Sequence, residues 1–186
     1  MLLPRTHHRF SVIEYDQMIE FGILTENDRV ELIRGEIIEK MPIGDPHASC
    51  VKRCLRLFSS LIQDRATLSI QDPIRLPDSE PEPDVVLLEP RADFYASGKP
   101  VPDDLLLLIE VADSTLEFDR EVKLPLYAEN GIREYWIVNL QEECLEVHRN
   151  PAVDGTYRDC RTLRRGEEIE LLALPGVRVS VEQVLG

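Results

Sequence analysis

The chain has 186 residues, of which 43 % are hydrophobic and 30 % charged, and these proportions exclude a disordered chain. A domain of this length buries about 70 % of its unfolded surface without metal or disulfide support, so we expect one domain over residues 1–186. A net charge of −14 excludes a passive basic coat for nucleic acid, but an enzyme that meets nucleic acid through a bound metal remains compatible with it.

The sequence shows no segment typical of secretion or of membrane insertion. The N-terminal sequence MLLPRTHHRF lacks an apolar stretch long enough for a signal peptide. The longest apolar run, residues 105–109, is far shorter than the roughly 20 residues of a membrane span. The four cysteines form no CxxC pair, which disfavours structural zinc and indicates reduced cysteines that mostly pack. We therefore expect a cytoplasmic protein without membrane association.

The first third of the chain predicts a helix, a hairpin and a second helix. Ser11 is a suitable N-cap for a short helix that Gly22 stops. The run VELIRGEIIEKM, residues 30–41, predicts a β-hairpin that turns at Arg34-Gly35. Residues 47–63 carry apolar side chains at a period of 3.6, which predicts a helix packed on the core. Its stripe consists of Val51, Cys54, Leu55, Phe58, Leu61 and Ile62.

The remainder of the chain predicts a sheet with one further helix. Short strands are expected at 67–71, 84–89 and 105–111, the last apolar on both faces and therefore central. A helix over 118–130 contains Pro125 and ends at Gly131, and strands follow at 133–139 and 144–150. Two or three more short strands complete the chain. The pattern predicts an α/β or α+β fold, with helices enclosing a mixed sheet.

Three acidic residues lie where burial disfavours them. Asp84 begins an apolar strand directly after Pro83, Glu110 ends the LLLLIEV strand, and Glu31 lies inside the hairpin. A buried carboxylate costs desolvation unless it is paired or binds a cation. Asp84 and Glu110 lie in strands close enough in sequence to meet side by side, where their oxygens suit Mg²⁺ or Mn²⁺. The alternative for each acid alone is a strand-end cap or a pair with an arginine.

The runs EPDVVLL and LLLLIEVADST resemble the PD-(D/E)XK nuclease signature, with Asp84 and Glu110 as its acids. The usual lysine position, two residues after the second acid, holds Ala112, and the segment DREVKLPLYAENGIREYW supplies Lys123 instead. This order resembles the Uma2 family of putative restriction endonucleases, in which the lysine is displaced onto that helix. The family also has the early hairpin followed by Pro46-His47, and the resemblance covers roughly residues 11 to 150.

The resemblance implies a restriction-endonuclease-like fold and a set of catalytic roles. Asp84 and Glu110 become the metal ligands, while Lys123 stabilises charge on the phosphate or orients the attacking water. Glu31 completes the acidic cluster. Where the family has Ser-Pro after its second acid, this chain has Asp113-Ser114, and the extra carboxylate either adds a ligand or hinders the phosphate.

Two further residues are candidate substrate contacts. His47 either touches a phosphate or supports a ligand at the start of the long helix; the alternative is a solvent-facing ring. Tyr127 lies four residues after Lys123 on the same helix face, where packing against the lysine stem is the simpler interpretation. Tyr135 and Trp136 are expected to pack within their strand.

The function expected first is a Mg²⁺-dependent DNA endonuclease that cuts phosphodiester bonds with a metal-activated water and works as a homodimer. The alternative is a catalytically weak nuclease fold that acts as a binding or assembly module, which the charge of −14 favours mildly. A third reading is a metal-dependent hydrolase of a different phosphoester.

Overall fold

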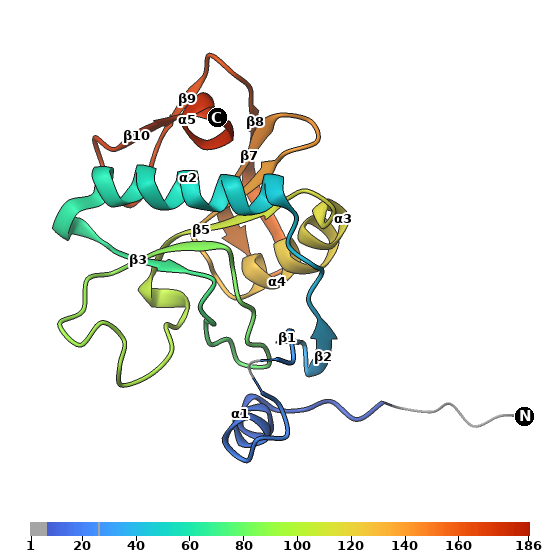
Figure 1. Cartoon of the computed structure of the whole chain (residues 1–186). Helices are drawn as coiled ribbons and strands as arrows, with labels where there is room; N and C mark the ends of the chain where they lie inside the picture. The colour runs from blue at the N-terminus through green and yellow to red at the C-terminus, as the bar shows by residue number, and fades with distance from the viewer. Residues whose placement is uncertain (1–6, 26) are drawn as a thin grey trace, which may run out of the picture.

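The computed structural model describes residues 7–25 and 27–186. Its centre is a six-stranded mixed sheet with the strand order β3-β4-β5-β6-β7-β8 (Figure 1). Neighbouring strands run antiparallel except β5 and β6, which are parallel. The strands are β3 (Thr67–Ile70), β4 (Val85–Leu88), β5 (Leu105–Ala112), β6 (Glu134–Asn139), β7 (Cys144–Ala152) and β8 (Thr156–Leu163). The predicted mixed sheet flanked by helices is confirmed.

Strand β5 is the most deeply placed strand, because all eight of its residues are buried. It lies between β4 and β6, so both its edges are paired and both its faces are covered. Successive side chains of a strand point to opposite faces, and the sheet accordingly separates two apolar clusters. Ile109 and Val111 belong to one cluster, whereas Leu108 and Ala112 belong to the other. Glu110 therefore points into the second cluster, among apolar neighbours.

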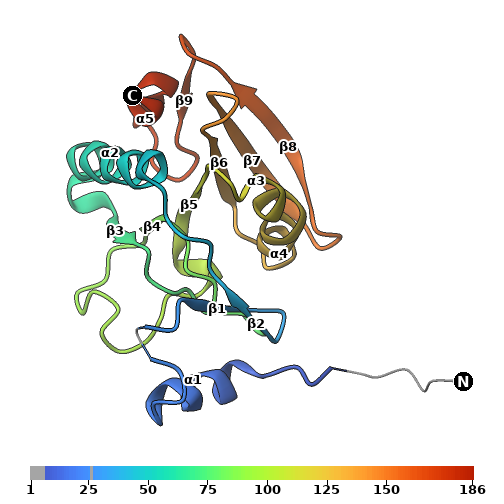
Figure 2. The same cartoon turned by 45° about the vertical axis from the view of Figure 1, so that its right-hand side comes forward.

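Helix α2 (Asp45–Ile62) covers the first face of the sheet, and the helical segment that contains α4 (Leu124–Glu129) covers the second (Figures 1 and 2). Helix α2 begins two residues earlier than predicted, because Pro46 is tolerated in the first turn of a helix. Its predicted stripe is largely confirmed, although Leu55 is exposed and Leu61 is only partly buried. Cys50 and Cys54 pack in this stripe, as expected.

The predicted helix over 118–130 is present but interrupted. It consists of α3 (Leu116–Phe118), the π-helical turn η3 (Asp119–Lys123) and α4 (Leu124–Glu129). The amide of Leu124 donates to the carbonyl of Asp119, five residues earlier. Pro125 follows this wide turn directly, and since proline has no N–H and crowds the preceding turn of a regular helix, the π turn accommodates it. Gly131 ends the segment with a φ of 76°, as predicted.

The smaller elements surround this core. Ser11 caps α1 as predicted, and the predicted hairpin turns at Arg34-Gly35. Tyr135 and Trp136 are buried in their strand, also as predicted. No helix among the described residues is long and apolar enough to span a membrane. These elements are α1 (Val12–Glu20), β1 (Val30–Ile33), β2 (Glu36–Glu39), η1 (Gln63–Arg65), η2 (Pro102–Asp104), β9 (Glu168–Glu170), β10 (Arg178–Ser180) and α5 (Val181–Leu185).

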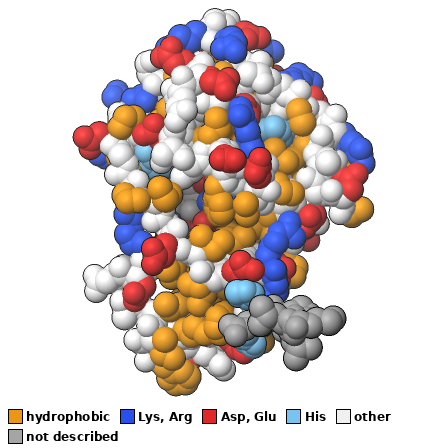
Figure 3. Space-filling model, turned by 90° about the vertical axis from the view of Figure 1, so that its right-hand side faces the viewer, with side chains coloured by type: hydrophobic (Ala, Val, Ile, Leu, Met, Phe, Trp, Pro, Cys, Tyr) orange, Lys and Arg blue, Asp and Glu red, His pale blue; other side chains and the backbone are white. Residues whose placement is uncertain are grey.

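The face of the molecule that Figure 3 shows carries both signs of charge. On the face drawn in Figure 3, lysine and arginine side chains are scattered among aspartate and glutamate rather than gathered in one basic patch. Apolar side chains gather towards the lower half of the same face. The electrostatic footprint of a protein that coats duplex DNA is therefore not visible on this face.

The packing of α2 makes a direct prediction for stability. Phe58 is fully buried between the helix and the sheet, near Trp136. Truncation of a buried Phe to Ala typically costs about 3–5 kcal/mol, so Phe58→Ala should lower the urea midpoint of unfolding strongly. Leu55→Ala on the same helix is the matched control, and because Leu55 is 42 % exposed it should change stability by about 0.5 kcal/mol or less. Equal effects of the two variants would contradict this packing.

Candidate active site

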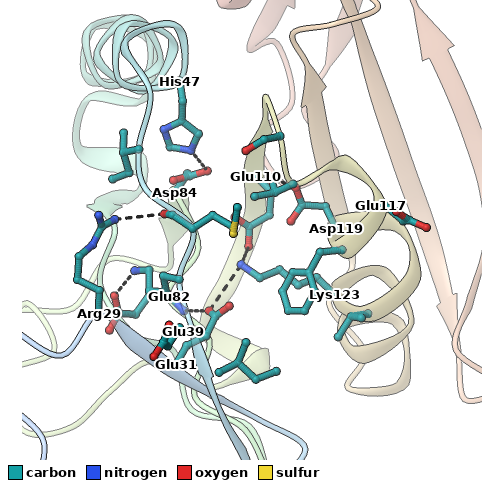
Figure 4. Close-up of a pocket in the computed structure, with 18 of the residues that line it drawn as sticks. Arg29, Glu31, Glu39, His47, Glu82, Asp84, Glu110, Glu117, Asp119 and Lys123 are labelled. Carbon is teal, nitrogen blue, oxygen red and sulfur yellow. Dashed lines mark hydrogen bonds and ion pairs between the residues drawn. The ribbon is translucent and has the colours of Figure 1, made fainter.

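The pairing of β4 with β5 brings Asp84 and Glu110 together. Val85 pairs with Ile109 in this antiparallel ladder, and one step further along both strands are Asp84 and Glu110. Residues directly opposite one another in an antiparallel pair point to the same face, with Cβ atoms about 5 Å apart. Asp84 and Glu110 therefore face the same space at one end of the sheet (Figure 4). The structure brings these two predicted ligands together.

Asp84 is held by three hydrogen-bond donors. Its Oδ2 accepts from Nε2 of His47 at 2.9 Å and from the amide of Val111 at 2.8 Å, and its Oδ1 accepts from Nε2 of Gln71 at 3.1 Å. Burial raises the pKa of Asp84, but the hydrogen bond and charge of His47 outweigh burial, so the net pKa is lowered. In the same pair, burial lowers the pKa of His47 and Asp84 raises it above its ordinary value. Asp84 and His47 thus form a hydrogen-bonded pair in which each residue favours the charged form of the other.

Glu110 is more deeply buried, with 3 % of its surface exposed. Its Oε1 accepts from Nζ of Lys123 at 2.9 Å and from the hydroxyl of Tyr127 at 2.8 Å. Burial raises the pKa of Glu110 to about 8, with the charge of Asp84 acting in the same direction and Lys123 opposing it. Burial also raises the pKa of Tyr127, which therefore remains a hydrogen-bond donor. Burial therefore disfavours the ionised form of Glu110, and a neighbouring cation favours it.

Lys123 supplies that cation from the helical segment on the second face. Its Nζ lies 2.9 Å from Glu110 Oε1 and 3.6 Å from Glu31 Oε2. Burial lowers the pKa of Lys123, but the charges of Glu110 and Glu31 outweigh this effect and raise it overall. The predicted approach of Lys123 to the acids is confirmed for Glu110. Asp84 is paired instead with His47.

Glu31 connects this group to the hairpin. It is buried in β1, and its Oε2 also accepts a hydrogen bond from the backbone amide of Glu82 at 3.1 Å. Because Glu31 shares Lys123 with Glu110, the hairpin and the central strand are joined through one ammonium group. The structure therefore places Glu31 beside the lysine, at the edge of the predicted acidic cluster (Figure 4).

These side chains open onto a cavity of about 520 Å³. It contains two residues that the sequence did not single out. Asp119 is buried, accepts a hydrogen bond from Thr115 at 2.7 Å, and has its pKa raised to about 6 by burial. Its position four residues before Lys123 is the signal that identifies it, since both then share one side of the helical segment. Gln71, with a left-handed φ of 55°, donates a hydrogen bond to Asp84. No sequence motif identifies Gln71 as part of the site.

Whether this site fits a divalent cation depends on its remaining acceptor capacity. An ionised carboxylate offers about four lone-pair sites, and three donors occupy Asp84. No hydrogen bond from the described residues reaches Oε2 of Glu110, so this oxygen and Oδ1 of Asp84 retain free capacity. Within the described ranges, no three His, Cys, Asp or Glu side chains form a ready metal-binding group. Two carboxylates fit Mg²⁺, which commonly keeps several waters and takes further oxygens from a substrate phosphate.

The two predicted substrate contacts lie against the acids. The ring of His47 lines the cavity, but its Nε2 is engaged by Asp84 and its side chain is only 13 % exposed. The predicted solvent-facing alternative for His47 is therefore wrong. Tyr127 is fully buried and does not line the cavity, so its hydroxyl reaches Glu110 rather than open space. Asp113 does not line the cavity either.

The buried pair predicts a measurable coupling between Lys123 and Glu110. Lys123→Met leaves a buried carboxylate without its cation, and breaking such a pair typically costs about 3–5 kcal/mol. Adding Glu110→Gln removes the stranded charge, so the double variant should be more stable than Lys123→Met alone. Urea unfolding of both variants, with exposed Lys52→Met as the control, measures the coupling. A Lys123→Met protein as stable as the control would rule out a strong buried pair.

Comparisons with known proteins identify the family and the fold. The chain matches the Uma2 family, described as "Putative restriction endonuclease", over residues 12–182. A crystal structure of a putative nuclease of DUF820 from Anabaena variabilis is similar, with a TM-score of 0.64 and 19 % identity over 89 % of this chain and 95 % of that one. At that identity the similarity shows the fold alone, a nuclease-like mixed sheet. A search of curated proteins found no match. Since the family match spans most of its length, the chain belongs to the Uma2 family.

Proposed function

We propose that the protein is a metal-dependent DNA endonuclease that hydrolyses phosphodiester bonds with Mg²⁺ or Mn²⁺. The observation that supports this proposal most strongly is the facing pair of carboxylates with an ammonium group beside it. Asp84 and Glu110 occupy opposite positions of two strands, and Lys123 lies 2.9 Å from Glu110 at the wall of one cavity. Two acids and a lysine are the groups that hold a cation and offset charge on a phosphate.

Each residue has a role that follows from its contacts. Asp84 and Glu110 hold the cation, which when bound polarises a phosphoryl oxygen and lowers the pKa of a water. Lys123 offsets the negative charge that develops on the phosphate. Glu31 orients Lys123 through their 3.6 Å contact and so tunes the reaction.

His47 and Tyr127 keep the two ligands in position. Each makes one hydrogen bond to a ligand carboxylate, His47 to Asp84 and Tyr127 to Glu110. Such outer contacts fix the orientation of ligands and are typically worth about 10- to 100-fold in metal affinity or activity. His47 also lines the cavity and is the better candidate for a direct substrate contact.

A second candidate function is a binding or assembly module with weak catalysis. The described residues contain no ready group of three metal-binding side chains, and the net charge is −14. Calorimetric titration with Mg²⁺ and Mn²⁺ separates the two candidates, because a module without catalysis does not require a divalent metal site.

Homodimerisation remains a prediction, and a measurement of the molecular mass in solution tests it.

Incubation with supercoiled plasmid and with circular single-stranded DNA tests the proposed function. Cleavage is expected in Mg²⁺ or Mn²⁺ and none in chelator. Loss of one contact to the transition state typically costs about 10²–10³ in rate, so Lys123→Met should cleave more slowly by that factor. Circular dichroism checks that the variant is folded under the assay conditions. A folded Lys123→Met protein that cleaves at the parent rate would contradict the role of the lysine.

Metal binding should also be visible in thermal unfolding. At a metal concentration of 100 times Kd, binding to the folded state adds about 2.7 kcal/mol of stability. For a domain of this size that corresponds to a rise in Tm of roughly 5–10 °C. Asp84→Asn should abolish the rise, whereas Asp103→Asn, at an exposed position of η2, should retain it. An unchanged rise in Asp84→Asn would remove Asp84 from the ligand set.

A further inference from the structure

The lining of the cavity combines charged and apolar side chains. Beside the acids and Lys123 lie five large apolar residues, which we call the apolar wall: Ile38, Met41, Ile43, Phe118 and Val122. Met41 and Ile43 are 58 % and 43 % exposed, so their side chains are not consumed by the core. Exposed apolar surface that adjoins a polar site is typical of a ligand-binding surface. A phosphate group is charged and gains nothing from contact with apolar side chains, so the apolar wall indicates that another part of the ligand binds there.

Phe118 is an apolar lining residue that lies close to Lys123. Its ring centroid lies 6.0 Å from Nζ of Lys123, the nitrogen that faces the predicted scissile phosphate. Phe118 is only partly buried, in α3 at the edge of the second apolar cluster. A nucleotide whose phosphate lies near Lys123 thus has an aromatic ring within reach of its base. Bases stack on aromatic side chains irrespective of sequence, because every base has a π face.

The charge of the cavity disfavours a duplex. Among the described residues, eight aspartate or glutamate side chains line it, against three lysine or arginine side chains and His47 (Figure 4). Two of these cations, Lys40 and Lys123, are already paired with Glu82 and Glu110. Duplex DNA presents one negative charge per about 1.7 Å of its axis, and proteins that bind it neutralise several phosphates with free lysine and arginine. The phosphates of a duplex bound over this cavity would therefore face mostly acidic side chains.

We infer that the substrate is unpaired DNA, a single strand or an unpaired segment, whose base lies on the apolar wall while its phosphate lies at the acids. This inference rests on the proposed function and names the substrate class of the same site. In a duplex the bases are stacked on one another and offer only their edges. An unpaired nucleotide brings half the charge density of a duplex and exposes its base. The cavity of about 520 Å³ falls within the range of about 300–1,000 Å³ of pockets that enclose small ligands.

Binding and cleavage are tested separately. The Glu110→Gln protein, which keeps the shape of the side chain, is titrated in Mg²⁺ with fluorescent single-stranded and duplex oligonucleotides of the same sequence. Fluorescence anisotropy should give at least about tenfold tighter binding of the single strand. The parent protein in chelator provides the same comparison if Glu110→Gln does not fold. Equal or tighter binding of the duplex in the protein that is folded would overturn the inference.

The apolar wall is tested with two phenylalanine variants. Removing one stacking side chain typically weakens binding by roughly five- to a hundredfold, so Phe118→Ala should weaken single-strand binding by that factor and change duplex binding little. Phe94→Ala is the matched control, since Phe94 is 76 % exposed and lies outside the cavity. Thermal unfolding confirms that both variants are folded. Unchanged single-strand affinity in folded Phe118→Ala would also overturn the inference.

A cleavage assay distinguishes this inference from the proposed function. The parent protein in Mg²⁺ or Mn²⁺ receives a duplex that contains one unpaired segment, and cuts are expected within that segment. Cuts distributed equally over paired and unpaired positions would refute the substrate class while supporting the nuclease. Selective binding of single strands without any cleavage would uphold the substrate class and refute the proposed function.

Discussion

Two carboxylates occupy opposite positions of neighbouring buried strands, and the arrangement around them depends on how their charge is neutralised. Asp84 and Glu110 point into the same face because the antiparallel register of β4 and β5 places them there. Their charges repel in a region of low polarity, where the cost of an unpaired ion is several kcal/mol. Two separate partners offset this cost. His47 arrives from the start of α2 and Lys123 from the helical segment on the other face of the sheet.

These two side-chain pairs join parts of the chain that are distant in sequence. The Asp84–His47 pair fixes the start of α2 against the end of β4, and the Glu110–Lys123 pair fixes the helical segment against β5. Glu31 brings the hairpin to the same lysine. Elements from the first, second and third quarters of the sequence therefore meet at one small polar centre between two apolar clusters. Such a centre is most sensitive to the loss of His47 or Lys123, since either removal leaves a buried carboxyl group without its partner.

Lys123 reaches Glu110 from the helical segment rather than from strand β5. The usual position two residues after the second acid is Ala112, which is fully buried in the second apolar cluster. The π turn η3 contains Asp119 and Lys123 at its two ends, both buried on the side of the acids. Turns of this kind are rare and frequently occur at functional sites. The segment thus accepts Pro125 and directs an ammonium to Glu110 within the same few residues.

The sequence by itself determined the elements and the identity of the charged residues. Periodicity located α2, the buried strand β5 and the hairpin, since apolar spacing reports directly which face of an element is buried. Burial of a carboxylate in an apolar run identified Asp84, Glu110 and Glu31. Only the tertiary structure decided which cation meets which acid, because pairing depends on the register between strands and on how helices fold back. That is why His47 proved to be the partner of Asp84, and why Gln71 and Asp119 joined the site without a motif of their own. Local patterns specify what a residue prefers, whereas the distances between residues far apart in the chain are set by the packing of the whole sheet.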